Sequence, residues 1–130
     1  MIQSEKVYRL SFGTIITIND HLAEVIIDEG VELDEHLVDA YHDFLLSHLK
    51  APFSLLINKK NSYSYTFEAQ KVIGSLNEID NMAVLVGTLG STLATKTIIS
   101  LKGRDNIKIF VTRKEALDWL INQQNKKTAI

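Results

Sequence analysis

The chain has 130 residues, of which 45% are hydrophobic and 23% charged, and its formal net charge is -2. This length and composition predict one globular domain over residues 1–130, with an ordered core from about residue 7 to about residue 123. The near-neutral charge gives no attraction to phosphate backbones, which argues against a nucleic-acid partner, and the lack of cysteine excludes disulfides and thiolate catalysis.

Three strands are predicted at the start of the chain. Residues 7–19 alternate around Gly13, which predicts a β-hairpin with its turn near Gly13, because glycine takes the positive φ that such turns often need. Leu22–Ile27 predicts a third strand, which ends at Asp28, Glu29 and Gly30.

The hydrophobic period then becomes helical over residues 32–50. Apolar and aromatic residues share one face at about 100° per residue, and Pro52 prevents continuation of the helix. The members of this face are Leu33, Leu37, Tyr41, Phe44, Leu45 and His48. Phe53–Asn58 follows as a short apolar strand, and Thr66 is predicted to cap a second helix that runs to about residue 77.

Strand and helix alternate in the rest of the chain. Residues 82–87 form a continuous apolar run, typical of a strand covered on both faces. A third helix is predicted over residues 90–101 and a last strand over residues 107–111. Thr112 and Glu115 form a capping box that opens a fourth helix, and the polar residues 122–130 are expected to fray.

This order of elements predicts an α/β fold. We expect a mixed, mostly parallel sheet with an N-terminal antiparallel hairpin at its edge and about four helices. Phe53–Asn58 is the predicted central parallel strand. The segment after it would then lie at the carboxyl end of the sheet, where ligands usually bind in open α/β folds.

The arrangement resembles the SpoIIAA-like small proteins of the STAS superfamily over roughly residues 7–123. The most specific part is the ending Glu115-Ala116-Leu117-Asp118-Trp119-Leu120, directly after the last strand. The resemblance implies a bacterial regulatory module that is not an enzyme, acts by protein–protein interaction and forms a possible homodimer. The alternative is a small carrier that binds a lipid-like or apolar ligand between the helices and the sheet. In the anti-sigma-factor antagonists of the superfamily a serine is phosphorylated, and by position it would fall within Ser62, Ser64 or Thr66.

Residues 59–66 are the candidate switch or ligand loop. The loop combines two cations, Lys59 and Lys60, with three hydroxyl groups from Ser62, Tyr63 and Ser64. A second aromatic ring follows at Tyr65, just ahead of the helix start at Thr66. Free N–H groups and the helix dipole there favour an anionic headgroup or peptide. The alternative interpretation is an ordinary connection with its tyrosines folded over the edge of the core.

No catalytic, cofactor or metal motif is complete, so we expect a protein without enzymatic activity, cofactor or metal. Residues 90–97 nearly match a phosphate-binding loop, but Thr95 stands where the glycine before Lys96 should be. His36 shares a predicted helix face with Asp39 and Asp43, which is either a cation site or a solvated acidic stripe. The amino terminus lacks the apolar run of a signal peptide, and no apolar stretch approaches the roughly 20 residues that span a bilayer. We therefore expect a cytoplasmic protein.

Overall fold

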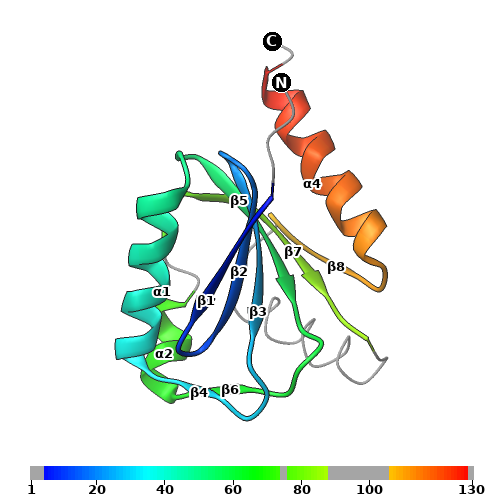
Figure 1. Ribbon diagram of the computed structural model, residues 1–130. Helices are drawn as coiled ribbons and strands as arrows, with labels where there is room; N and C mark the ends of the chain where they lie inside the picture. Colours follow the sequence, from blue (N-terminus) through cyan, green and yellow to red (C-terminus); the bar gives the residue numbers. More distant parts are fainter. Residues whose placement is uncertain (1–4, 74–75, 88–105, 129–130) are drawn as a thin grey trace.

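Figure 1 shows the computed structural model, and the structure describes residues 5–73, 76–87 and 106–128. Within these ranges the elements in chain order are β1 Lys6–Leu10, β2 Gly13–Asn19, β3 Leu22–Ile27, β4 Glu32–Leu33, α1 Glu35–His48, β5 Phe53–Asn58, β6 Ser64–Tyr65, α2 Phe67–Val72, β7 Ile79–Leu85, β8 Ile107–Phe110 and α4 Arg113–Thr128. The described ranges thus contain three of the roughly four helices expected. The helix predicted over residues 90–101 lies outside them.

Six of the described strands form the main sheet, in the order β1-β2-β3-β5-β7-β8. β1 with β2 and β2 with β3 are antiparallel, whereas β3 with β5, β5 with β7 and β7 with β8 are parallel. The prediction of a mixed, mostly parallel sheet with an antiparallel hairpin at one edge is confirmed. Phe53–Asn58 is also confirmed as a central strand, because β5 has parallel neighbours on both sides.

The hairpin turns close to the predicted position, but the reason given for the glycine is wrong. Leu10 pairs with Gly13 around the two-residue turn of Ser11 and Phe12. Among the described glycines Gly30 has a positive φ, of 78°, and Gly13 does not. A Cβ at Gly13 would collide with the carbonyl oxygen of Ile26 in β3. Glycine is therefore required there by the close approach of two backbones.

The first helix starts later than predicted. Asp34 is its N-cap, and the side chain of Asp34 accepts a hydrogen bond from the Leu37 N–H at 2.9 Å. Because this cap fixes the helix start at Glu35, the two preceding residues are free to form β4, which pairs in parallel with β6. The helix ends at His48, just short of the predicted end.

The other two described helices also differ from their predicted lengths. α2 ends at Val72, short of the predicted residue 77. The tail expected to fray from residue 122 is helical as far as Thr128, so that prediction is wrong. The side-chain amide of Gln124 donates to the carbonyl oxygen of His21 at 2.8 Å, which ties this part of α4 to the turn between β2 and β3.

Helices cover both faces of the sheet, with α1 and α2 on one face and α4 on the other (Figure 1). Under α1 and α2, the largest fully buried side chains include Phe53, Leu55, Ile15 and Leu45. Under α4, Leu22 and Leu56 of the sheet pack with Ala116 and Leu120 of the helix. Trp119 of α4 is half-buried, with its ring 5.7 Å from that of Phe110. Burial of both faces explains the apolar sequence of β5.

The substitution Gly13→Ala is expected to lower the free energy of unfolding by about 1–3 kcal/mol, since its methyl group has no room beside Ile26. Gly87→Ala is the matched control, because a Cβ at Gly87 meets nothing within 4 Å. Urea unfolding of both variants measures the difference. Equal stability of the two variants would contradict the close approach of the strands.

Candidate functional site

The candidate loop leaves the carboxyl end of β5, at the edge that β5 shares with its parallel neighbours β3 and β7. The loop runs from Lys59 through β6 to Thr66, which is the N-cap of α2. The Oγ1 atom of Thr66 accepts a hydrogen bond from the Ala69 N–H at 3.1 Å. The predicted geometry of strand exit and capped helix is therefore present. Its role as a functional site stays a prediction.

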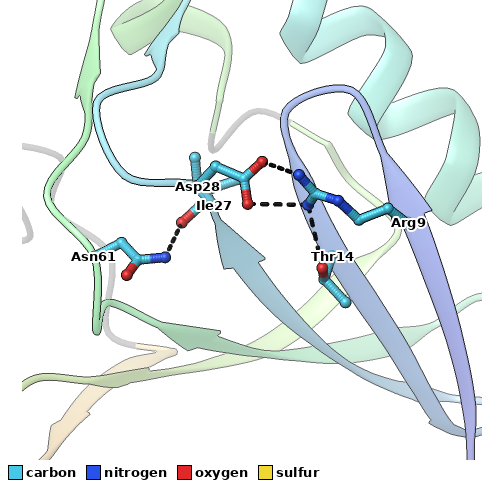
Figure 2. A network of polar contacts seen from close by, with 5 residues as sticks. All are labelled: Arg9, Thr14, Ile27, Asp28 and Asn61. Carbon is cyan, nitrogen blue, oxygen red and sulfur yellow. Dashed lines mark hydrogen bonds and ion pairs between the residues drawn. The ribbon is translucent and has the colours of Figure 1, made fainter.

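A ladder of backbone hydrogen bonds holds the loop against the segment that follows β3. The N–H of Gly30 donates to the Ser62 carbonyl at 2.7 Å, the N–H of Ser64 to Val31 at 3.0 Å, and the N–H of Thr66 to Leu33 at 2.9 Å. The side-chain amide of Asn61 adds a bond to the Ile27 carbonyl at 2.9 Å (Figure 2). Glu29 accepts from the Ser62 N–H. These bonds make the loop an ordered element of the sheet edge.

The two tyrosines of the loop face the core. Tyr63 and Tyr65 are half-buried, pack against the cluster beneath α1, and stack edge to face with ring centroids 5.6 Å apart. Burial raises the pKa of both phenols and of Tyr41 nearby, so all three stay neutral. Within the described part of the chain, the buried hydroxyl of Tyr63 has no hydrogen-bond partner. The tyrosines thus match the interpretation in which they fold over the core edge.

Lys59 lies against these rings. Its Nζ atom is 5.0 Å from the ring centre of Tyr63 and 5.9 Å from that of Tyr65. Burial lowers the pKa of Lys59, and it forms no ion pair with a carboxylate of residues 5–73, 76–87 or 106–128. Contacts with two ring faces partly offset the loss of water around the ammonium group. Lys59 therefore helps to fix the tyrosines, whereas Lys60 is exposed.

Exposed groups follow one another from the loop into α2. Lys60, Ser62 and Ser64 are exposed, and Phe67 at the start of α2 has 68% of its surface exposed. The Nζ atom of Lys71, one turn on, lies 4.4 Å from the centre of the Phe67 ring. We call these five residues the Phe67 face. Phe67 was not among the predicted site residues, although an aromatic residue directly after a helix cap was a visible signal.

An ion pair beside the loop also escaped the sequence analysis. Figure 2 shows Arg9 of β1 reaching Asp28 at the end of β3, with both carboxylate oxygens engaged. Arg9 also donates to the Thr14 hydroxyl at 3.3 Å. The hydrogen bond from Arg9 and its charge hold the pKa of Asp28 below its usual range. The pair ties the hairpin to the segment on which the loop rests.

A second ion pair, between a buried carboxylate and an arginine that reaches the surface, lies on the α4 face of the sheet. Glu24 of β3 is 2% exposed and accepts from Nε and Nη2 of Arg113 at 3.0 and 2.8 Å. Its other oxygen accepts from the side-chain amide of Asn58 at 3.0 Å. One carboxylate thus joins β3, β5 and the first residue of α4. The one signal in the sequence was a charged residue within the apolar strand Leu22–Ile27.

The other sites considered from sequence gain no support. Within the described residues no three side chains of His, Asp or Glu come together as metal ligands, so His36, Asp39 and Asp43 do not form a cation site. The near match to a phosphate-binding loop over residues 90–97 lies outside the described residues. In the same described ranges, no helix is both long and apolar enough to cross a membrane.

Comparison with known proteins identifies the fold. No family model matches the chain and no curated protein matches it. Among solved structures, an uncharacterized protein of the DUF3478 family from Shewanella loihica PV-4, described as having a SpoIIAA-like fold, superposes with a TM-score of 0.54. The match covers 90% of this chain and 92% of that one. The chain has a SpoIIAA-like fold. At 14% identity the likeness shows the fold alone.

The ion pair of Glu24 with Arg113 predicts that replacing Arg113 lowers stability, whereas replacing its neighbour Lys114 hardly changes it. Arg113→Met should lower the free energy of unfolding by about 1–3 kcal/mol, because Glu24 stays buried with fewer donors. Lys114→Met removes only the exposed pair with Asp118 and should change it by less than about 0.5 kcal/mol. Equal effects in urea unfolding would contradict the role of Glu24.

The ion pair of Arg9 with Asp28 predicts that the stability of the fold depends on pH. The pKa of Asp28 is lowered in the folded state, so its contribution to stability is present above the unfolded value of about 4 and is lost as pH falls through the folded value. Asp28→Asn should therefore lower stability near neutral pH and flatten the loss of stability in acid.

The control for this test is Asp43→Asn, which removes an exposed carboxylate that has no ion pair among the described residues. Unfolding midpoints measured across the acid range compare the two variants with the parent chain. The account of Asp28 fails if both variants keep the pH profile of the parent.

Proposed function

We propose that this chain is a non-catalytic, STAS-like regulatory module that binds a protein partner through the Phe67 face. The observation that carries the proposal is Phe67 itself, 68% exposed at the capped start of α2. Exposure of a large aromatic side chain to water is unfavourable, and covering it with a partner lowers the free energy of the complex. Phenylalanine, like tyrosine and tryptophan, is also enriched in the cores of protein–protein interfaces.

The loop supports this role because its backbone is already ordered. Hydrogen bonds to residues 27–33 hold Ser62, Ser64 and Thr66 in place before any partner arrives. A preformed surface binds with a smaller loss of conformational entropy than a disordered one. Lys59, Tyr63 and Tyr65 have a supporting role in this proposal, since their side chains face one another and the core.

The chemistry of the face indicates the kind of partner. Lys60 and Lys71 are exposed cations on either side of Phe67 along the chain, and neither forms an ion pair with a described carboxylate. An apolar pocket rimmed by carboxylates on a partner would complement this arrangement. The rival function, a carrier of a lipid-like ligand between helices and sheet, is less favoured because buried side chains such as Phe53, Leu55 and Val38 already occupy that layer.

The proposal predicts position-specific crosslinking in cells of the native host. A photo-reactive phenylalanine analogue at Phe67 should give one discrete protein adduct, identified by mass spectrometry. The same analogue at Val111 is the matched control and should give no adduct. Val111 is 65% exposed and follows β8, the last strand in the sheet order.

Quantitative binding to the partner so identified completes the test. Phe67→Ser should weaken the affinity for this partner by roughly tenfold or more. Val111→Ser should leave the affinity nearly unchanged, and neither variant should change stability much. Equal crosslinking from both positions would contradict the proposal. A bound lipid in native mass spectra, with no adduct at position 67, would favour the carrier instead.

A further inference from the structure

The hairpin leaves one margin of the sheet open. Among the strands that the structure describes, β1 is the first in the sheet order and pairs with β2 alone (Figure 1). Because Leu10 and Gly13 close a two-residue turn, alternation along the strand directs the backbone groups of Lys6 and Tyr8 toward β2. The backbone groups of Val7 and Arg9 then point away from the sheet. In the described residues they make no backbone hydrogen bond to a turn or loop.

Side chains along this strand separate into two sets. Val7 and Arg9 lie on the α4 side of the sheet, with Glu5 before them, and Lys6 and Tyr8 lie on the α1 side. Val7 is 68% exposed. The open margin thus offers unpaired backbone groups, an exposed valine and charges of both signs.

Backbone geometry limits how two copies of β1 can pair antiparallel about a two-fold axis. A residue whose backbone N–H and C=O point away from its own sheet must lie opposite another such residue. The pairing is therefore centred on one residue of β1, and the alternatives are the pairings centred on Lys6, Val7 and Tyr8. Pairing centred on Lys6 places two lysines directly opposite each other, which is destabilising. Pairing centred on Tyr8 places Val7 opposite Arg9, and leaves Glu5 opposite the turn.

Pairing centred on Val7 places no like charges opposite each other and gives each charged residue a favourable neighbour. The two valines meet on the axis, and Glu5 of each copy lies opposite Arg9 of the other. On the α1 side, Lys6 lies opposite Tyr8, close enough for the ammonium group to contact the ring. Arg9 uses its two terminal nitrogens for Asp28 and Thr14, so its Nε–H remains for the incoming carboxylate.

We propose that β1 pairs antiparallel with β1 of a second copy of this chain, with Val7 opposite Val7. The two six-stranded sheets then form one continuous sheet across the axis. A five-residue strand buries a small area, so the dimer should be weak and depend on concentration. This surface is separate from the Phe67 face, and the proposal does not depend on the proposed function.

Sedimentation of the full chain over a concentration series tests the pairing. The parent chain should shift from monomer to dimer. Val7→Pro removes one outward N–H from each copy and should weaken dimerisation by roughly tenfold or more. Val7→Thr is the matched control, because it keeps both the N–H and the β-branched shape, and it should dimerise like the parent.

A second variant keeps the test decisive if Val7→Pro fails to fold. Glu5→Lys lies before the strand and places like charges opposite Arg9 twice in the dimer, so it should also weaken dimerisation. A parent chain that stays monomeric at every concentration would overturn the proposal. So would a Glu5→Lys variant, or a folded Val7→Pro variant, that dimerises as tightly as the parent.

Discussion

The parallel pairing of β5 with β3 and β7 is the constraint on which the rest of the structure depends. It brings the carboxyl ends of three strands to one edge, so the segments that leave β3 and β5 start side by side. That proximity lets residues 30–33 and 62–66 bond to one another and places the start of α2 beside them. Without the parallel pairing of β5 with β3, these two segments would not start side by side and the ladder would not form.

Two ion pairs secure the sheet around this edge in different ways. Arg9 and Asp28 meet at the surface, where water weakens their attraction, and mainly fix the hairpin relative to the end of β3. Glu24 is buried, and its bonds to Asn58 and Arg113 fix the start of α4 over β3 and β5. The buried carboxylate depends on those donors, because an unpaired charge in the core is strongly unfavourable.

The sequence was most informative where one residue determines a local structure or where a period repeats. The apolar run Phe53–Asn58 and the cap at Thr66 predicted a strand and a helix start that the structure contains. The predicted face of α1 includes the buried Tyr41 and Leu45, but it missed the buried Val38 and included His48, which is exposed. β4 and β6 are two residues each, too short for any period to show. The tail of α4 contacts His21, and no local pattern encodes that contact.

The sequence did not predict the long-range polar contacts. Arg9 and Asp28 are 19 residues apart and Glu24 and Arg113 are 89 apart, so pairing them required the strand register and the helix position. The same is true of the candidate loop. Its residue types were visible in sequence, but which of them face the core and which face water follows from the ladder to residues 27–33.

A preformed loop is the central claim, and amide hydrogen exchange of the free protein measures it directly. The amides of Gly30, Ser64 and Thr66, which donate the ladder bonds, should exchange far more slowly than an unstructured peptide does. Exchange of these three amides at the unstructured rate, while β5 remains protected, would contradict the account.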